Sequence, residues 1–194
     1  MSEHRHEVVL VRHGQTEWSL SGQHTGSTDI PLTAQGRVQA QALGARLAGW
    51  RFERVLSSPL ARAVDTCRLA GMGDQARITD DLREWDYGEY EGRRTIDIRE
   101  ERPGWGLWAD GVPGGETVEE VGRRADRVIE AARGAFGDVA LFGHGHLLRV
   151  LAARWIGLPP DHGRLLALST ASISGLGWER ETAVLERWDE TAGD

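Results

Sequence analysis

An arginine and a histidine stand side by side where a short apolar run ends, in the stretch LVRHGQTEW that contains Arg12 and His13. A guanidinium can hold two oxygens of an anion at once, and a neutral imidazole nitrogen is a nucleophile toward phosphorus. Arg62 follows a second apolar run, RVLSS, and His144 and His146 follow a third, DVALFG. Alone, the Arg12-His13 pair is typical of a surface loop with an ion-paired arginine and a solvated histidine, so its chemistry depends on whether the three segments meet.

Buried strands are expected directly before these polar residues, at 7–12, 54–57 and 138–143, because each run is apolar and rich in β-branched residues. Helical patterns separate the strands. This alternation predicts an α/β fold, a three-layer α/β/α sandwich with a mostly parallel central sheet, in a single domain over residues 1–194. Ligands bind such sheets beyond the carboxyl ends of the strands. The polar residues that follow the three strands are therefore expected at one edge of the sheet.

The helices carry their own start signals. Thr33 is an N-cap candidate, and Thr117 forms a capping box with Glu120. The Ser58-Pro59 pair is expected to cap the helix that carries Arg62 in its first turn. Apolar spacing predicts which helix faces are buried. Val38, Ala42 and Ala45 share one face of a helix over 33–50, and Leu60, Val64 and Cys67 share one face of the next helix. Further helices are expected to end near Arg133 and Ile156, and short β-like runs extend from Leu165 to Trp188.

Composition narrows the class of partner. The chain has 194 residues, 40% of them hydrophobic, and a formal net charge of −7 at pH 7. That balance is typical of a globular domain and provides no basic field, so neither nucleic acid nor a membrane is expected as a partner. No Cys/His cluster has metal-site spacing, and neither a metal nor another cofactor is expected. The single cysteine, Cys67, and the lack of a long apolar segment favour the cytoplasm; the oligomeric state is left open.

Four segments in chain order resemble the histidine phosphatase (phosphoglycerate mutase-like) superfamily. They are RHGQTEW from Arg12, SSPLAR from Ser57, LREW with YGEYEG from Leu82, and GHGH from Gly143, within matches that extend over about residues 8–178. An RHG motif alone is a weak signal, whereas the four segments together are specific. The resemblance implies an enzyme, a phosphomonoesterase whose partner is a small phosphorylated metabolite.

By this resemblance, His13 is the nucleophile that becomes a phosphohistidine. The transferred group spreads negative charge over its equatorial oxygens, so catalysis depends mainly on positioning and positive charge. Arg12 and Arg62 suit this task because they are planar and always charged, and the helix N-terminus beside Arg62 adds favourable partial positive charge for the anion. His144 is expected to complete the pocket as a charged donor; the alternative is a neutral histidine between strand and helix.

A carboxylic acid is needed to protonate the leaving alkoxide, and it can then activate water. Glu84 occupies the family's position for this role, with Glu89, Glu91 and Asp81 as nearby alternatives. The Thr25-Gly26 pair is equally typical of a simple turn. The residues expected on the substrate side are Ser19, Thr25, Gly26, Tyr87, Gly145 and His146.

Some positions depart from the phosphoglycerate mutases, which carry Asn where this chain has Ser19 and His146. The mutases bind the carboxylate of their substrate with a longer basic stretch, and this chain has the short, Trp-rich segment 93–115 in its place. Hydrolysis is therefore favoured over mutase activity, and the pattern is most similar to sedoheptulose-1,7-bisphosphatases and small bacterial acid phosphatases. A non-catalytic module that binds a phosphorylated ligand is a further alternative, although such a module needs no proton donor.

A sugar bisphosphate would need a second anion site several ångströms from His13. The candidate cations are Arg93, Arg94, Arg99 and Arg149, for which a solvated helix face balanced by acidic residues is the alternative. Tryptophans are expected in the core at Trp50, Trp155 and Trp178, and in the core or in a lid over the sugar at Trp105 and Trp108.

Overall fold

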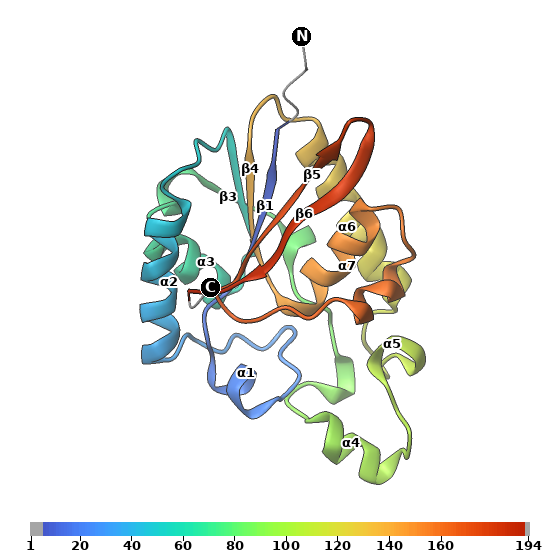
Figure 1. The fold of residues 1–194 in the computed structure, drawn as a ribbon. Coiled ribbons are helices and arrows are strands. Elements are labelled where there is room, and N and C mark those ends of the chain that lie inside the picture. The colour runs from blue at the N-terminus through green and yellow to red at the C-terminus, as the bar shows by residue number, and fades with distance from the viewer. Residues whose placement is uncertain (1–5, 193–194) are drawn as a thin grey trace.

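The computed structural model describes residues 6–192, and one six-stranded sheet with the order β3-β2-β4-β1-β5-β6 forms its centre (Figure 1). Strands β1 to β4 run parallel to one another, whereas β5 is antiparallel to β1 and β6 to β5. The expected mostly parallel sheet is confirmed. The strands are β1 (Val8–Arg12), β2 (Arg54–Ser57), β3 (Ala76–Ile78), β4 (Val139–Gly143), β5 (Ile173–Glu179) and β6 (Thr182–Glu190).

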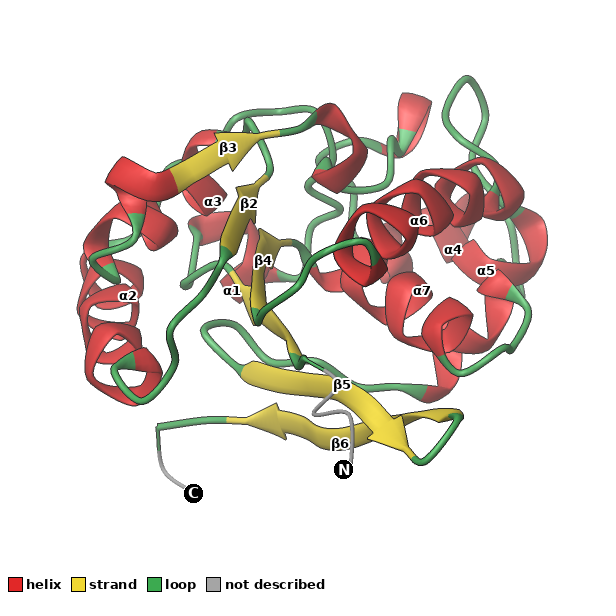
Figure 2. Ribbon diagram, turned by 90° about the horizontal axis from the view of Figure 1, so that it is seen from above, coloured by secondary structure: helices red, strands yellow, loops and turns green. Residues whose placement is uncertain are grey.

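Helices cover both faces of the sheet, which confirms the three-layer sandwich. Helices α2 (Ala34–Leu47) and α3 (Ala61–Leu69) lie on one face, and α6 (Val118–Arg133) and α7 (Gly145–Trp155) on the other (Figure 2). The short helices α1 (Glu17–Ser21), α4 (Thr95–Glu101) and α5 (Leu107–Asp110) lie toward the end of the molecule where β1 ends. Short 3-10 helices span Gly73–Gln75, Asp80–Leu82, Gly88–Tyr90 and Pro160–Leu165.

Two apolar clusters, one on each face, make the core. Along β1, Val8 and Leu10 join the cluster with α6 and α7, and Val9 and Val11 join the cluster with α2 and α3. Because both faces of β1 are buried, its sequence is apolar throughout rather than alternating. Among the tryptophans expected in the core, Trp155 is fully buried, whereas Trp50 and Trp178 are partly buried and pack against the clusters.

The N-caps at Thr33 and Thr117 are confirmed, the latter with both bonds of its capping box. The predicted Ser58-Pro59 cap is wrong: α3 begins at Ala61, with Leu60 as its N-cap residue. The hydroxyl of Ser58 instead lies against a histidine after β4 and accepts from the backbone N–H of Leu60.

The face of α2 was also predicted wrongly. Helix α2 ends at Leu47 rather than near residue 50, and Val38, Ala42 and Ala45 are exposed. The buried stripe instead contains Leu43 and Leu47, whose larger side chains remove more apolar area from water than the alanines would.

The three polar segments meet because their strands are neighbours. β4 pairs with both β1 and β2, with Arg12 opposite Gly143 and Ser57 opposite Phe142. The three strands therefore end at nearly the same level, and the residues that follow them share one edge of the sheet. Across residues 6–192, no helix is both long and apolar enough to span a membrane.

Candidate active site

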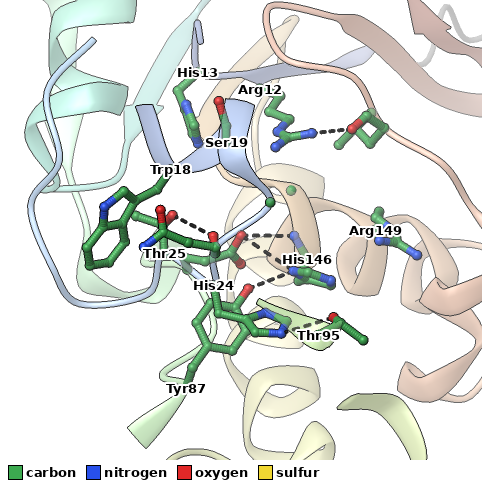
Figure 3. A pocket seen from close by; sticks show the side chains of 15 residues that line it. Arg12, His13, Trp18, Ser19, His24, Thr25, Tyr87, Thr95, His146 and Arg149 are labelled. Carbon is green, nitrogen blue, oxygen red and sulfur yellow. Dashed lines mark hydrogen bonds and ion pairs between the residues drawn. The ribbon is translucent and has the colours of Figure 1, made fainter. Parts of the chain in front are cut away.

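A pocket of about 280 Å³ lies at this edge, between the loop after β1, the 84–95 segment and the first turns of α7 (Figure 3). At its inner end lie Arg12 and His13; at its outer end lie His24, Tyr87 and Thr95. The lining residues are Arg12, His13, Trp18, Ser19, Gly22, Gln23, His24, Thr25, Glu84, Tyr87, Thr95, Gly145, His146, Arg149 and Leu168.

Most of the residues predicted from the sequence line this pocket. Arg62, His144 and Gly26 do not; they lie behind its inner end. The sequence interpretation missed several lining residues, namely Trp18, Gly22, Gln23, His24, Thr95 and Leu168. For His24 the available signal was its place in the loop that joins Ser19 to Thr25, both already expected at the substrate.

The imidazole of His13 is held in one tautomer. Its Nδ1 lies 2.7 Å from the carbonyl oxygen of Gly14, which can only accept, so Nδ1 carries the proton and Nε2 keeps its lone pair. Burial, followed by the charges of Arg12 and Arg62, holds the pKa of His13 well below its usual range. The imidazole is therefore neutral. Gly14 is required because a Cβ there would lie 2.4 Å from the carbonyl oxygen of Gly36.

The guanidinium of Arg12 lies beside His13 and keeps a buried donor without a partner in the described chain. Its Nη1 donates to the carbonyl of Leu168, and its buried Nε has no hydrogen-bond partner among residues 6–192. A Cβ on Gly145 would lie 3.2 Å from the Arg12 Cζ, so the glycine lets the guanidinium approach the first turn of α7. An unpaired buried donor is costly, and an anionic oxygen would satisfy it.

Arg62 is fully buried behind the pocket, where its guanidinium holds a loop and a histidine. Its Nε donates to Nδ1 of His144 at 3.2 Å. The other nitrogens donate, at 2.9–3.0 Å, to the carbonyl oxygens of Thr25, Gly26 and Thr28. Gly26 thus contributes its backbone carbonyl behind the pocket rather than a pocket wall.

His144 is neutral in this arrangement. Because Arg62 donates to Nδ1, the proton of the imidazole is on Nε2, which lies 2.8 Å from the hydroxyl of Ser58. Burial, followed by the charges of Arg62, His13 and Arg12, holds the pKa of His144 well below its usual range. The sequence interpretation expected a charged donor, whereas here the positive charge belongs to Arg62. The rings of His13 and His144 are 5.2 Å apart.

The carboxylate of Glu84 faces the pocket from beneath the first turn of α7. It is 7% exposed and accepts three backbone N–H bonds, from Trp85, His146 and Leu147, at 2.9–3.0 Å. Helix N-termini suit a carboxylate because their N–H groups lack partners in the helix. Among the described residues that line the pocket, Glu84 alone is acidic.

The alternative acids lie elsewhere. Asp81 forms an ion pair with Arg127, and Glu89 is exposed outside the pocket. Glu91 accepts the backbone N–H groups of Gly26 and Thr28. The geometry therefore favours Glu84 as the proton donor.

The outer end of the pocket is aromatic and largely uncharged. The hydroxyl of Tyr87 and Nδ1 of His146 share a hydrogen bond of 2.6 Å, and the rings of His24 and Tyr87 are 4.8 Å apart. Burial lowers the pKa of His24, lowers that of His146 well below its usual range and raises that of Tyr87 well above its usual range. Hydroxyl groups and C–H faces of a ligand would suit these rings better than a second anion would.

The candidate cations are separated by the structure. Arg93 and Arg94 form ion pairs at 2.6 Å with Glu101 and Asp97, and neither lines the pocket. Arg99 donates to a backbone carbonyl. Arg149 alone among the four lines the pocket, where its guanidinium lies 5.0 Å from the ring of Trp108. Trp105 is a core residue, and Trp108 packs against the same cluster and against the rings of Trp85 and His146; neither is a lining residue of the pocket, so the lid expected as one alternative is not seen.

Metal ligation has no visible basis in the described part of the chain, where no group of three or more His, Cys, Asp or Glu side chains could hold a metal ion. The chemistry that the pocket can perform rests on a neutral imidazole, guanidinium groups and a carboxyl group.

Comparison with known proteins agrees with this chemistry. A model of the histidine phosphatase superfamily (branch 1) matches residues 8–191. An acid phosphatase from Mycobacterium tuberculosis is 42% identical over 192 residues, 95% of this chain and 94% of the relative. A sedoheptulose 1,7-bisphosphatase from Saccharomyces cerevisiae is 39% identical over 183 residues, 77% of this chain and 67% of the relative. A solved structure of a Mycobacterium tuberculosis open reading frame product matches with a TM-score of 0.91 and 40% identity, over 96% and 98% of the two chains.

Proposed function

Because the chain belongs to the histidine phosphatase superfamily, we propose that it hydrolyses small phosphorylated metabolites, mainly sugar phosphates, through a phosphohistidine at His13. One observation carries this proposal: a neutral imidazole with a free Nε2 lies beside an arginine with an unpaired buried donor, in a pocket whose acidic residue is Glu84. A module that only binds a phosphorylated ligand would need neither the nucleophile nor the acid.

In the first step, Nε2 of His13 attacks phosphorus while the bond between phosphorus and the sugar oxygen breaks. Protonated Glu84 gives its proton to the departing oxygen, so the sugar leaves as a neutral alcohol. The imidazole needs no general base because it is already neutral. The guanidinium of Arg12 donates hydrogen bonds to the phosphoryl oxygens and so stabilises the negative charge that grows on them. The positive charge of Arg62 lies behind it and acts in the same direction.

In the second step, the carboxylate of Glu84 takes a proton from water, and the resulting hydroxide attacks phosphorus. The phosphorus–nitrogen bond breaks, the electron pair returns to His13, and inorganic phosphate leaves. One carboxyl group thus acts first as acid and then as base.

The outer end of the pocket supports a sugar as the leaving group. Its rings can pack on the C–H faces of a sugar, and His24, Thr95 and His146 offer polar atoms to hydroxyls. Arg149 lines the pocket, and although its Nε and Nη2 donate to the carbonyl oxygens of Gly163 and Arg164, its charge makes it the candidate among the four arginines for a second phosphate. The similarity to a sedoheptulose 1,7-bisphosphatase supports such a substrate.

We also propose a cytoplasmic location, where cysteines stay reduced. The single cysteine, Cys67, is a free thiol that is buried, and burial raises its pKa to about 12.

Phosphate release across sugar monophosphates and bisphosphates, phosphoglycerates, nucleotides and p-nitrophenyl phosphate, in excess EDTA, tests this function. We expect release in EDTA, fastest with sugar phosphates. Isomerisation of a phosphoglycerate without phosphate release would indicate a mutase instead. Loss of activity in EDTA that magnesium or zinc restores would contradict the proposed mechanism.

A further inference from the structure

Glu91 takes no part in the chemistry above, yet its carboxylate is tightly engaged. Oε1 accepts the backbone N–H groups of Gly26 at 2.8 Å and Thr28 at 3.1 Å. Oε2 is buried and has no hydrogen-bond partner in the described part of the chain. The carboxylate therefore fixes the 25–28 loop from one side while part of its charge stays unpaired.

Arg62 holds the same loop from the other side. Its guanidinium donates to three carbonyl groups of the 25–28 loop, while the N–H groups of Gly26 and Thr28 point to Glu91. The peptide groups of the loop thus lie between a carboxylate and a guanidinium, oriented so that each charge is stabilised. Burial lowers the pKa of Arg62, and nearby acidic groups, Glu91 among them, act in the opposite direction.

Gly26 makes this close approach possible. A Cβ at this position would lie 2.5 Å from the carbonyl oxygen of Trp85 and 2.7 Å from Oε2 of Glu91. A larger residue would push the loop off the carboxylate, and the carbonyl groups would lose their alignment with Arg62. The loop is therefore packed against both charges at once.

The fixed guanidinium of Arg62 in turn orients a histidine at the inner end of the pocket. Nε of Arg62 donates to Nδ1 of His144, which sets the tautomer of an imidazole whose ring lies 5.2 Å from that of His13. The hydrogen bonds run without a gap from Glu91 through the 25–28 loop and Arg62 to His144.

We propose that Glu91 is a positioning residue for the phosphoryl site: through the 25–28 loop it fixes the Arg62 guanidinium, and through Arg62 it fixes the tautomer of His144. This inference rests on the proposed function in that Arg62 and His144 are taken to serve the transferred phosphoryl group. The competing explanation is a purely structural role, in which Glu91 stabilises the 25–28 loop and has no effect on phosphate binding.

A double-mutant cycle separates the two explanations. The variants are Glu91→Gln, Arg62→Gln and the double variant; the readouts are the Kd for inorganic phosphate by calorimetry and kcat/KM with p-nitrophenyl phosphate. We expect Glu91→Gln to weaken phosphate binding and kcat/KM about tenfold in the native background and less than about twofold when Arg62 is already Gln, because residues in one hydrogen-bond network are not additive.

Glu53 provides the matched control. Its carboxylate also accepts two backbone N–H groups, those of Phe136 and Gly137, but just before β2 and β4 begin, at the far end of the sheet from the pocket. Glu53 is exposed, so Glu53→Gln is expected to lower thermal stability by no more than Glu91→Gln does, and it should leave phosphate binding unchanged. Glu91→Asp, which keeps the charge, replaces Glu91→Gln in the cycle if the latter does not fold.

Unchanged phosphate binding in Glu91→Gln, or an equal loss in both Arg62 backgrounds, would overturn the inference. The failure of the proposed function looks different: the coupling between Glu91 and Arg62 in phosphate binding would remain, but the native protein would release no phosphate from any ester.

Discussion

The inner and outer ends of the pocket are built from different parts of the fold. His13 and His144 directly follow β1 and β4, and Arg62 lies in the first turn of α3. His24 and Thr95 instead lie on the loop after α1 and at the start of α4, outside the sheet. Strand ends buried by helices hold side chains rigidly, whereas loops can change without disturbing the core. The difference suggests that the inner end fixes the reaction and the outer end selects the substrate.

The two ends also differ in charge. The inner end combines the guanidinium group of Arg12 with a neutral nucleophile and has that of Arg62 behind it, whereas the rest of the pocket holds neutral rings and the cation Arg149. Substitutions at the inner end should therefore slow turnover of every substrate. Substitutions at the outer end should change the preference among substrates.

Arg62→Gln is expected to have a large effect on all substrates. Removal of its charge should lower kcat/KM about 100-fold, or about 3 kcal/mol, which is typical of losing a preorganised charged donor. Arg62 is fully buried and holds three loop carbonyls, so thermal stability should fall as well.

Arg154→Gln is the control for this prediction, because Arg154 forms a bidentate ion pair with Asp126 away from the pocket. A loss in kcat/KM for Arg62→Gln no greater than for the control would remove Arg62 from the catalytic end.

Glu84→Gln should divide substrates by their leaving group. A sugar alkoxide needs a proton, so kcat should fall about 100-fold with sugar phosphates; p-nitrophenolate hardly needs one, so the loss with its phosphate should be about tenfold or less. Steady-state kinetics with both substrates measure this difference, with the exposed Glu89→Gln as control. Equal losses on the two substrates would show that Glu84 is not the acid.

Arg149→Met probes the outer end. If a second phosphate binds there, KM for a sugar bisphosphate should rise about tenfold, while KM for p-nitrophenyl phosphate stays nearly constant, because one charged hydrogen bond is lost for one substrate only. Arg93→Ala and Arg94→Ala should change neither KM, since both arginines are ion-paired outside the pocket. An equal rise for both substrates would mean that Arg149 serves the inner end.

The pH profile should show a small effect. Burial keeps the pKa of His13 well below 6.5, so the nucleophile stays neutral as pH falls from 7.5 to 5.5 and is protonated only below that depressed pKa. The Glu84→Gln variant with p-nitrophenyl phosphate isolates the nucleophile, because no catalytic acid titrates and the leaving group hardly needs a proton. For this pair we expect kcat/KM to change less than about threefold over this range, whereas a histidine of ordinary pKa would lose about tenfold. Thermal unfolding must be measured beside the assay, because the stability of the folded protein also falls with falling pH. Below about pH 6.5 the histidines bind protons in the unfolded chain, whereas the buried histidines of the folded chain stay neutral. An acid limb centred near pH 6.5 in fully folded enzyme would contradict this account of His13.

The inner end could be predicted from the sequence because its parts are local. An apolar run predicts a buried strand, and the residue after it must lie at the edge of the sheet, which placed Arg12 and His13 and the histidines after β4. Short elements gave no such signal: β3 has three residues, and α1, α4 and α5 have too few to show periodicity.

The sequence left open the charge of His144 and the choice among the four candidate arginines. The first depends on a residue distant in the chain, and the second depends on which acidic neighbours the arginines contact. His144 is neutral because Arg62, 82 positions earlier, donates to its Nδ1. Arg149 stands apart from Arg93 and Arg94 because those two find acidic partners on α4.

The central claim is that the reaction passes through a phosphate bond to His13. Enzyme mixed with a ³²P-labelled sugar phosphate and quenched during turnover should carry label that is labile in acid and stable in alkali, as a phosphorus–nitrogen bond requires. Mapping should place it on His13, and His13→Ala should lose both label and turnover, while His24→Ala keeps the label. Turnover by His13→Ala, or label that is stable in acid, would contradict the account.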